Sequence, residues 1–375
     1  KILINTNHSF YIFAIQKIIN MDPNAGKKNM FNKLSKDQCV ALLEKETFNR
    51  VTISFYKYII LKDLPELRDE LYNKWSDLGV LGRIYIAQEG VNAQLSVPEP
   101  HWEEFVKNIN SYDFFEDIHF KIAVEDDGKS FFKLTIKIRK QIVADGLSIK
   151  DYDVTNVGKH LSAKQWNEAM NNGAIVVDMR NHYESEIGKF EDAICPDVET
   201  FKEELPVVKD LLKGKEKEEV LLYCTGGIRC EKTSAYLKHF GFENVSQLHG
   251  GIIDYVRQLN EDETIENKFL GKNFVFDERR GERISEDVIS TCHQCDEPCD
   301  MHVNCNNVNC NLLFLQCNKC QKLHENCCSV ECIEVLTLPE EDKLTLRKGV
   351  ENKKIYYSHS RVKLNLKRVE KNEKN

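Results

Sequence analysis

The stretch that decides the fold reads Tyr223-Cys224-Thr225-Gly226-Gly227-Ile228-Arg229-Cys230-Glu231-Lys232. The residues before it, 219–223, are apolar and β-prone, which predicts a buried strand. Residues 230–240 have apolar residues near helical spacing, and Gly241 is a typical helix stop. Cys224 is therefore predicted to lie where a strand ends and a tight loop enters a helix.

This position favours the thiolate form of Cys224. Two glycines allow the loop to turn its N–H groups inward, the start of the helix adds positive partial charge, and Arg229 can add a full charge. Because the thiolate is the nucleophilic form, Cys224 is the candidate catalytic residue. The candidates for stabilising its anion are Thr225, Gly226, Gly227, Ile228, Arg229 and Cys230. The alternative is a core cysteine at a strand end, which needs neither glycines nor an arginine.

The totals limit the class of protein. A chain of 375 residues predicts two or three domains. A net charge of −8 argues against a uniformly basic surface for nucleic acid but allows local basic patches. No secretory signal is evident, and the apolar run at residues 10–15 is too short to span a bilayer. We expect a cytoplasmic chain without a membrane segment, whose cysteines stay reduced.

The N-terminal part is predicted to be an α+β domain. Residues 1–47 are polar and are expected to be poorly ordered, and residues 48–140 follow the order β-α-β-β-α-β of a ferredoxin-like domain. This fold specifies no function by itself. Positive charge occurs on or near its strands at Arg83, Lys133, Lys137, Arg139 and Lys140. Such charges are usually solvated, and contact with nucleic acid is the alternative reading.

The middle part is predicted to be an α/β domain. Residues 141–170 are interpreted as a connector, and strands alternate with helices over residues 171–263, which implies a parallel sheet. The run 174–178 is apolar and ends in a carboxylate, as a buried parallel strand does. Functional loops of such sheets lie at the carboxyl ends of the strands. Asp178 and Arg180 are expected to organise the loops there rather than to react.

The C-terminal part is predicted to be a small metal-binding module at residues 285–335. Ten of the 14 cysteines lie in it, and two CxxC pairs in a cytosolic chain are typical of zinc. An iron–sulfur cluster or redox thiols are the alternatives. The spacing does not choose the ligands among Cys292, Cys295, Cys299, Cys305, Cys310, Cys317, Cys320, Cys327, Cys328 and Cys332. Residues 340–375 form a basic tail that is suited to phosphate contacts.

The chain resembles a known family. The middle domain is similar to rhodanese domains at Asp178-Met179-Arg180, Gly188-Lys189-Phe190-Glu191-Asp192-Ala193, Cys224 to Arg229, and His249-Gly250-Gly251-Ile252. Together with the flanking motifs Ala87-Gln88-Glu89-Gly90-Val91-Asn92-Ala93-Gln94 and Gly271-Lys272-Asn273-Phe274-Val275-Phe276-Asp277-Glu278-Arg279, residues 51 to 332 resemble the bacterial rhodanese-domain-containing tRNA uridine hydroxylases.

The resemblance implies an oxidoreductase that acts on RNA. Members of that family convert the wobble uridine of certain tRNAs to 5-hydroxyuridine with molecular oxygen. It implies Cys224 as the catalytic cysteine, through a thiolate or a persulfide, and the tRNA anticodon loop as partner. Cys230 could resolve an oxidised Cys224 or be a buried helix-start residue. No flavin or haem motif is evident, and the electron or sulfur donor and the oligomeric state are left open.

Two other functions fit the same loop. A persulfide sulfurtransferase would use identical loop chemistry, and only the flanking domains argue against it. A non-enzymatic zinc-dependent RNA-binding protein would not require an intact Cys224 loop.

Overall fold

The computed structural model describes residues 34–116, 118–123, 130–147, 151–277 and 279–347. The chain divides into two compact units, residues 1–142 and 143–375. Most of the expected disordered extension, residues 1–33, and of the basic tail, residues 348–375, lies outside the described residues. At the borders of these stretches the structure describes α2 (Lys36–Leu43) and α12 (Glu340–Arg347). No helix in the described ranges is long and apolar enough to cross a membrane.

The first unit is built on a five-stranded sheet with the order β4-β1-β3-β2-β5. Its elements are β1 (Arg50–Tyr58), α3 (Leu64–Asp77), β2 (Leu81–Ala87), β3 (Gly90–Pro98), α4 (Trp102–Asn110), β4 (Lys121–Ile122) and β5 (Leu134–Ile138). The pairs β4–β1, β1–β3 and β3–β2 are antiparallel, as in a ferredoxin-like fold, and β5 adds a parallel edge strand next to β2. The ferredoxin-like prediction is confirmed.

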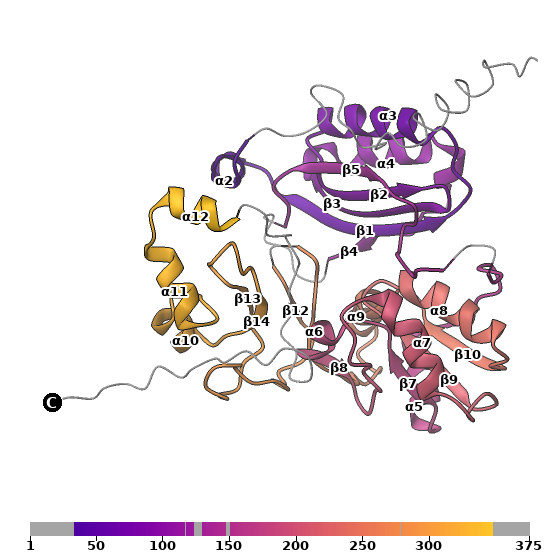
Figure 1. Cartoon of the computed structure of the whole chain (residues 1–375). Coiled ribbons are helices and arrows are strands. Elements are labelled where there is room, and N and C mark those ends of the chain that lie inside the picture. The colour runs from indigo at the N-terminus through magenta and orange to yellow at the C-terminus, as the bar shows by residue number, and fades with distance from the viewer. Residues whose placement is uncertain (1–33, 117, 124–129, 148–150, 278, 348–375) are drawn as a thin grey trace, which may run out of the picture. The chain divides into compact units, whose positions relative to one another are not determined.

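The two helices α3 and α4 cover one face of this sheet (Figure 1). Side chains of a strand alternate between the faces, so Ile53, Phe55 and Ile84 point to the helices and are buried. They pack with Trp75 of α3 and Phe105 of α4, whose rings are 5.5 Å apart. The other face carries the alternate residues of the same strands.

The second unit contains a four-stranded parallel sheet with the order β6-β10-β9-β7. Its elements are β6 (Lys159–Leu161), α5 (Ala163–Asn171), β7 (Ile175–Asp178), α6 (His182–Ser185), β8 (Gly188–Phe190), α7 (Phe201–Leu211), β9 (Glu219–Tyr223), α8 (Ile228–His239), β10 (Asn244–Leu248) and α9 (Gly251–Glu261). The predicted parallel α/β domain is confirmed. Two strands were not expected: β6 lies in the range interpreted as connector, and β8 pairs outside this sheet.

The end of the chain adds two small sheets and a cysteine-rich part. Strand β8 pairs with β11 (Phe269–Asn273), which also pairs with β12 (Glu282–Arg283). The cysteine-rich part contains β13 (His302–Asn304), β14 (Leu313–Leu315), α10 (Asn318–Leu323) and α11 (Val330–Thr337). Its two hydrophobic clusters consist mostly of cysteines, with a few other apolar residues such as Leu312 and Phe314. Such a small core needs an additional source of stability, for which bound metal is the usual solution.

Candidate active site

Cys224 lies at the carboxyl end of β9, as the sequence predicts. β9 ends at Tyr223 and α8 begins at Ile228. Gly227, the residue before α8, has φ 91°, a left-handed conformation that side chains other than glycine rarely adopt. This turn brings the loop back over the sulfur of Cys224.

Hydrogen bonds from the loop surround the sulfur of Cys224. The N–H of Gly227 donates to Sγ over 3.1 Å, and the N–H groups of Arg229 and Cys230 also donate to it. Burial by itself raises the pKa of this fully buried thiol. The hydrogen bond from the Cys230 thiol, the charge of Arg229 and the backbone N–H groups outweigh burial and lower the pKa of Cys224 to about 5. Cys224 is therefore a thiolate at neutral pH.

Cys230 has the opposite character. Burial, followed by the hydrogen bond to the Cys224 sulfur, raises the pKa of Cys230 well above that of an ordinary thiol. Cys230 remains a thiol that donates its proton to the anion. The two sulfur atoms are therefore held as a hydrogen-bonded thiolate and thiol, the first in the loop and the second in the first turn of α8.

Arg229 is not a free charge beside the sulfur. Its Nη1 and Nη2 donate to the two carboxylate oxygens of Glu184 over 2.7 and 2.9 Å, and Glu184 is fully buried on α6. Thr225 Oγ1 lies 3.4 Å from Glu184 Oε1 and 3.5 Å from Arg229 Nη2. The ring of Phe276 also lies 6.0 Å from the guanidinium carbon. These contacts hold the Arg229 side chain, and the part of the loop that carries it, in one position.

The sequence analysis missed Glu184 and Glu204. Asn181 and Glu184 form a capping box at α6, a local pattern that identifies a helix start but not an ion pair with Arg229. Glu204 of α7 is fully buried, and neither carboxyl oxygen has a hydrogen-bond partner among the described residues. Burial raises the pKa of Glu204 well above its usual range, so it remains a neutral acid.

Asp178 and Arg180 form a fully buried network at the end of β7. Arg180 donates to both oxygens of Asp178 and to the carbonyl of Gly188 over 2.6 Å. The hydroxyl of Tyr223, the residue before Cys224, donates to Asp178 over 2.7 Å. Paired with each other and fully buried, these two side chains connect the ends of β7 and β9 to β8.

The start of α9 is hydrogen-bonded to the loop that carries Cys224. The N–H groups of Ile252 and Ile253 donate to the carbonyls of Cys224 and Thr225 over 3.1 and 3.2 Å. Gly251 has φ 70°, and a Cβ added to it would lie 2.5 Å from the carbonyl oxygen of Cys224. Only glycine fits this approach, which explains the glycine of the His249-Gly250-Gly251 motif.

Eight of the ten candidate cysteine ligands form two groups. One group is Cys292, Cys295, Cys317 and Cys320, and the other is Cys305, Cys310, Cys328 and Cys332; within each group the sulfur atoms lie within 4.8 Å of one another. Cys299 and Cys327 belong to neither group. The cysteine-rich part also contacts the loop side of the α/β domain, because His293 Nε2 lies 2.7 Å from Glu186 Oε1, at the end of α6.

The sulfur spacing fits a tetrahedral metal. Four thiolates at about 2.3 Å from a zinc ion would be about 3.8 Å from one another. The distances are 3.6 Å for Cys295–Cys317, 3.6 Å for Cys310–Cys328 and 3.7 Å for Cys328–Cys332. Both groups can therefore hold a metal ion.

Family models match three consecutive parts of the chain. They are a UPF0176 acylphosphatase-like domain at residues 50–142, a rhodanese-like domain at 162–258 and a rhodanese C-terminal part at 270–333. A protein of Leptospira interrogans named tRNA uridine(34) hydroxylase is 54% identical over 338 residues, which are 90% of this chain and 92% of the relative. The chain belongs to the tRNA uridine(34) hydroxylase family. A Yersinia pestis protein of the same name is 48% identical over 86% of this chain and 91% of its own length.

Solved structures resemble a smaller part of the chain. The rhodanese-like domain from an Anabaena sp. protein covers 30% of this chain and 78% of its own, at 17% identity and a TM-score of 0.24. A rhodanese-like domain protein from Staphylococcus aureus covers 26% of this chain and 90% of its own, at 20% identity and a TM-score of 0.22. The membership of this chain in the tRNA uridine(34) hydroxylase family rests on the two full-length relatives.

Proposed function

We propose that this chain hydroxylates uridine 34 of tRNA to 5-hydroxyuridine and that Cys224 is its reactive residue. The observation that carries the proposal is the sulfur anion of Cys224, which receives N–H donors from the loop and has a pKa of about 5. The family membership supports the substrate, since the relatives are named for it. Cytoplasmic tRNA as substrate also agrees with the 14 free cysteines.

The chemistry follows from the nucleophile. The Cys224 thiolate, or a persulfide on it, adds to C6 of the uracil ring, and the electron pair of the C5–C6 double bond moves towards C5 and the C4 carbonyl. The electron-rich C5 then bonds to oxygen that derives from O2. When C6 releases the sulfur and C5 loses its proton, the C5–C6 double bond is restored with a hydroxyl at C5. The second oxygen atom leaves as water, which requires two electrons from an external donor.

The loop must open for this reaction because Cys224 has no exposed surface. Thr225, Gly226 and Ile228 are half-buried and form the outer side of the loop. The other side is fixed, since α9 holds the carbonyls of Cys224 and Thr225 and Glu184 holds Arg229. We therefore infer that the base enters past Gly226 and Gly227. Before the base enters, the N–H groups of Gly227, Arg229 and Cys230 stabilise the anion of Cys224.

Zinc is proposed as the structural metal of the cysteine-rich part. Cys292, Cys295, Cys317 and Cys320 would hold one ion, and Cys305, Cys310, Cys328 and Cys332 the other. Each ion would supply folding energy to a part whose core is mainly cysteine. The chain's own thiolates hold the module in place and take no part in the reaction at Cys224.

The test replaces one cysteine at a time in a strain that lacks the chromosomal gene. We expect tRNA from cells with Cys224→Ser to contain no 5-hydroxyuridine at position 34, as measured by mass spectrometry of nucleosides. The matched control is Cys195→Ser. Burial raises the pKa of the Cys195 thiol to about 12, and its sulfur lies 3.6 Å from the carbonyl of Ala193, so this residue is an unreactive thiol. A normal content of 5-hydroxyuridine in the Cys224→Ser strain would overturn the proposal.

A sulfurtransferase would behave differently in the same experiment. It would transfer sulfur from thiosulfate to cyanide through Cys224, while the tRNA of the deletion strain would keep its normal nucleosides. The nucleoside content of the tRNA therefore distinguishes the two functions. Loss of activity in the Cys224 variant does not, because both functions need Cys224.

A further inference from the structure

The outward face of the five-stranded sheet in the first unit has an unusual composition. Strand alternation and register place Arg83 opposite Gln94, and Tyr85 between Asn92 and Lys137, on the face away from α3 and α4. Lys133 and Arg139 extend the ladder at the two ends of β5, because the Lys133 carbonyl accepts from the N–H of Gly82 and the Arg139 N–H donates to Ile86. Their alternation with the buried residues of β5 puts both side chains on this outward face.

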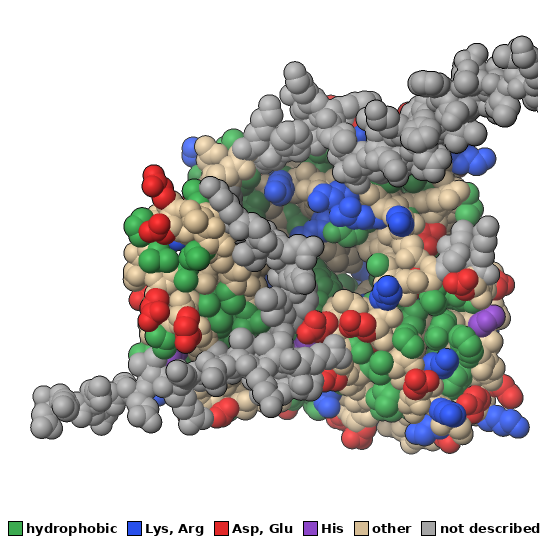
Figure 2. All heavy atoms as spheres, viewed as in Figure 1, with side chains coloured by type: hydrophobic (Ala, Val, Ile, Leu, Met, Phe, Trp, Pro, Cys, Tyr) green, Lys and Arg blue, Asp and Glu red, His purple; other side chains and the backbone are tan. Residues whose placement is uncertain are grey.

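Positive charge is segregated on this face. Its outward positions on β1 to β5 carry Arg50, Lys121, Arg83 and Lys137 within the strands, and they include no Asp or Glu. Arg50, at the start of β1, is paired with Glu46. The chain as a whole has a net charge of −8. Arg83, Lys133 and Lys137 are exposed, and none of them forms an ion pair with another residue in the described ranges. In Figure 2, Lys and Arg side chains gather over the strands of this sheet.

Aromatic rings are interleaved with these cations. Tyr85 is half-buried, and the guanidinium carbon of Arg139 lies 5.2 Å from the centre of its ring. Tyr56 of β1 is paired with Asn92 of β3. The ammonium nitrogen of Lys121 lies 4.4 Å from the centre of the Tyr56 ring. Partly exposed tyrosines between cations and side-chain amides form a surface on which bases can stack while phosphates contact the cations.

We propose that this sheet face, which we define by Arg83, Tyr85, Asn92, Lys137 and Arg139, binds single-stranded RNA of the tRNA substrate. A row of lysines on an edge strand can also serve only to prevent strand pairing between chains. That role explains charges on β5, but it explains neither Arg83 on the inner strand β2 nor the tyrosine between the cations. A polyanion with exposed bases is the partner that matches both the charge and the rings.

The inference rests on tRNA being the substrate, and binding is measured apart from hydroxylation. The variant Arg83→Gln/Lys137→Gln removes two exposed charges and leaves the core unchanged. Its affinity for a full-length tRNA transcript should fall roughly tenfold at low salt, and the dependence of log K on log salt should become less steep by about 1.4 for two lost single-strand contacts. Fluorescence anisotropy across a salt series gives both quantities, and thermal unfolding checks that the fold is retained.

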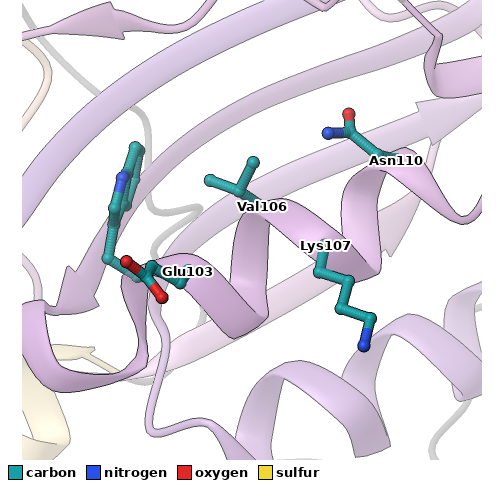
Figure 3. A pocket seen from close by; sticks show the side chains of 5 residues that line it. Glu103, Val106, Lys107 and Asn110 are labelled. Atoms are coloured by element: carbon teal, nitrogen blue, oxygen red, sulfur yellow. The ribbon is translucent and has the colours of Figure 1, made fainter.

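The matched control removes two charges from the helical side of the same unit. Lys62→Gln/Lys107→Gln changes the net charge by the same amount, and both lysines are exposed. Figure 3 shows Lys107 on α4 with Glu103 and Val106, along a pocket that this helix lines. We expect the control to retain the affinity and the salt dependence of the wild type. An equal loss in both variants would overturn the proposal, because the effect would then come from net charge alone.

A second pair of variants tests stacking. Tyr85→Leu should weaken binding of an unstructured oligouridylate at least about fivefold, while Tyr85→Phe, which retains the ring, should leave it unchanged. If Tyr85→Leu binds the oligonucleotide as the wild type does, or if polyglutamate of equal charge competes as well as RNA, the surface is a site for acidic protein and the proposal fails.

The outcomes separate this inference from the proposed function. A charge or Tyr85 variant that hydroxylates and binds tRNA as the wild type does would overturn the surface and leave the function at Cys224 intact. A wild-type chain that binds tRNA through this face but produces no 5-hydroxyuridine would overturn the function alone. A wild-type chain that binds no tRNA would overturn both.

Discussion

Glu184 binds Arg229 through two parallel hydrogen bonds of 2.7 and 2.9 Å, and both side chains are buried. The arginine of the Cys224 loop therefore carries a charge that is largely neutralised by its partner. Among the contributions that lower the pKa of Cys224, the hydrogen bond from the Cys230 thiol comes first, and the charge of Arg229 and the backbone N–H groups follow. Arg229 consequently has two roles. Its ion pair with Glu184 holds the loop in shape, and its charge lowers the pKa of Cys224.

Glu184→Gln should separate these two roles. Removing one partner of a buried ion pair leaves the other charge uncompensated, so the free energy of unfolding should fall by about 3 kcal/mol. The unpaired charge of Arg229 should at the same time lower the pKa of Cys224 further below about 5. Urea unfolding measures the first effect, and thiolate absorbance measures the second. The exposed Glu218→Gln serves as control and should change stability by less than about 0.5 kcal/mol.

The ionisation of Cys224 should contribute to stability in a defined pH range. The pKa of about 5 in the folded chain is below the value of about 8.5 for an unfolded cysteine. A lowered pKa gives stability that is complete above the unfolded value and is lost as the pH falls through the folded value. The stability of the wild type relative to Cys224→Ser should therefore decrease from about pH 8.5 to pH 5. A difference that does not vary with pH in this range would contradict the thiolate assignment.

Cys230→Ala should raise the pKa of Cys224, because the variant loses the thiol that donates to the sulfur anion. Cys230→Ser retains a donor and should leave the pKa of Cys224 near about 5. The difference between the thiolate absorbance of each variant and that of the same variant with Cys224→Ser gives both values. Equal pKa values in the alanine and serine variants would show that the Cys230 hydrogen bond contributes little.

Oxidation tests the proposed resolving role of Cys230. If Cys230 resolves a sulfenic acid on Cys224, brief treatment with peroxide should produce a Cys224–Cys230 disulfide that peptide mass spectrometry detects. The Cys230→Ser variant should instead accumulate the sulfenic acid on Cys224. Persistence of the sulfenic acid in the wild type would leave Cys230 as a structural residue.

Gly251→Ala should disturb the catalytic loop from behind. The added Cβ would lie 2.5 Å from the carbonyl oxygen of Cys224, so the loop has to shift and hydroxylation should be lost. Gly173→Ala is the matched control, since Gly173 also has a positive φ, 86°, but no atom within 4 Å of the added Cβ. The control should lose about 1 kcal/mol of stability from backbone strain and retain hydroxylation. Comparable hydroxylation in both variants would contradict the contact.

Metal content tests the division of the cysteines. Cys292→Ser and Cys305→Ser each remove one ligand from a different group, and each should lose one of two zinc ions per chain. Cys299→Ser and Cys327→Ser lie outside both groups and should retain two. Elemental analysis of the purified chains gives the count. One ion or none in the wild type would exclude two tetrahedral sites.

The sequence predicted what is set locally. The strand, the Gly226-Gly227 turn and the helix after Cys224 are consecutive, so the position of the thiolate could be inferred from the single stretch 219–241. Alternating strands and helices likewise predicted the parallel sheet, because the spacing of apolar residues within each segment indicates whether it is a strand or a helix.

What the sequence could not predict depends on distant partners. Glu184 and Arg229 are 45 residues apart, and no spacing rule connects a short capped helix with a loop arginine. The three-residue strands β6 and β8 are too short for periodicity to identify, and they form only because β10 and β11 pair with them. The choice of eight cysteines from ten also depends on the folded chain, since the spacings allow many combinations.

The contact between His293 and Glu186 links the metal content of the cysteine-rich part to the state of Cys224. His293 lies between two cysteines of one proposed zinc group, and Glu186 ends the short helix that carries Glu184. An oxidant or chelator that removes that ion would release the helix and weaken the hold of Glu184 on Arg229. The pKa of Cys224 should then fall, as in Glu184→Gln, and a thiolate of lower pKa is a weaker nucleophile. We expect chelation to slow alkylation of Cys224 before the parallel sheet unfolds, which would make this enzyme stop working under metal starvation while most of its body is still folded.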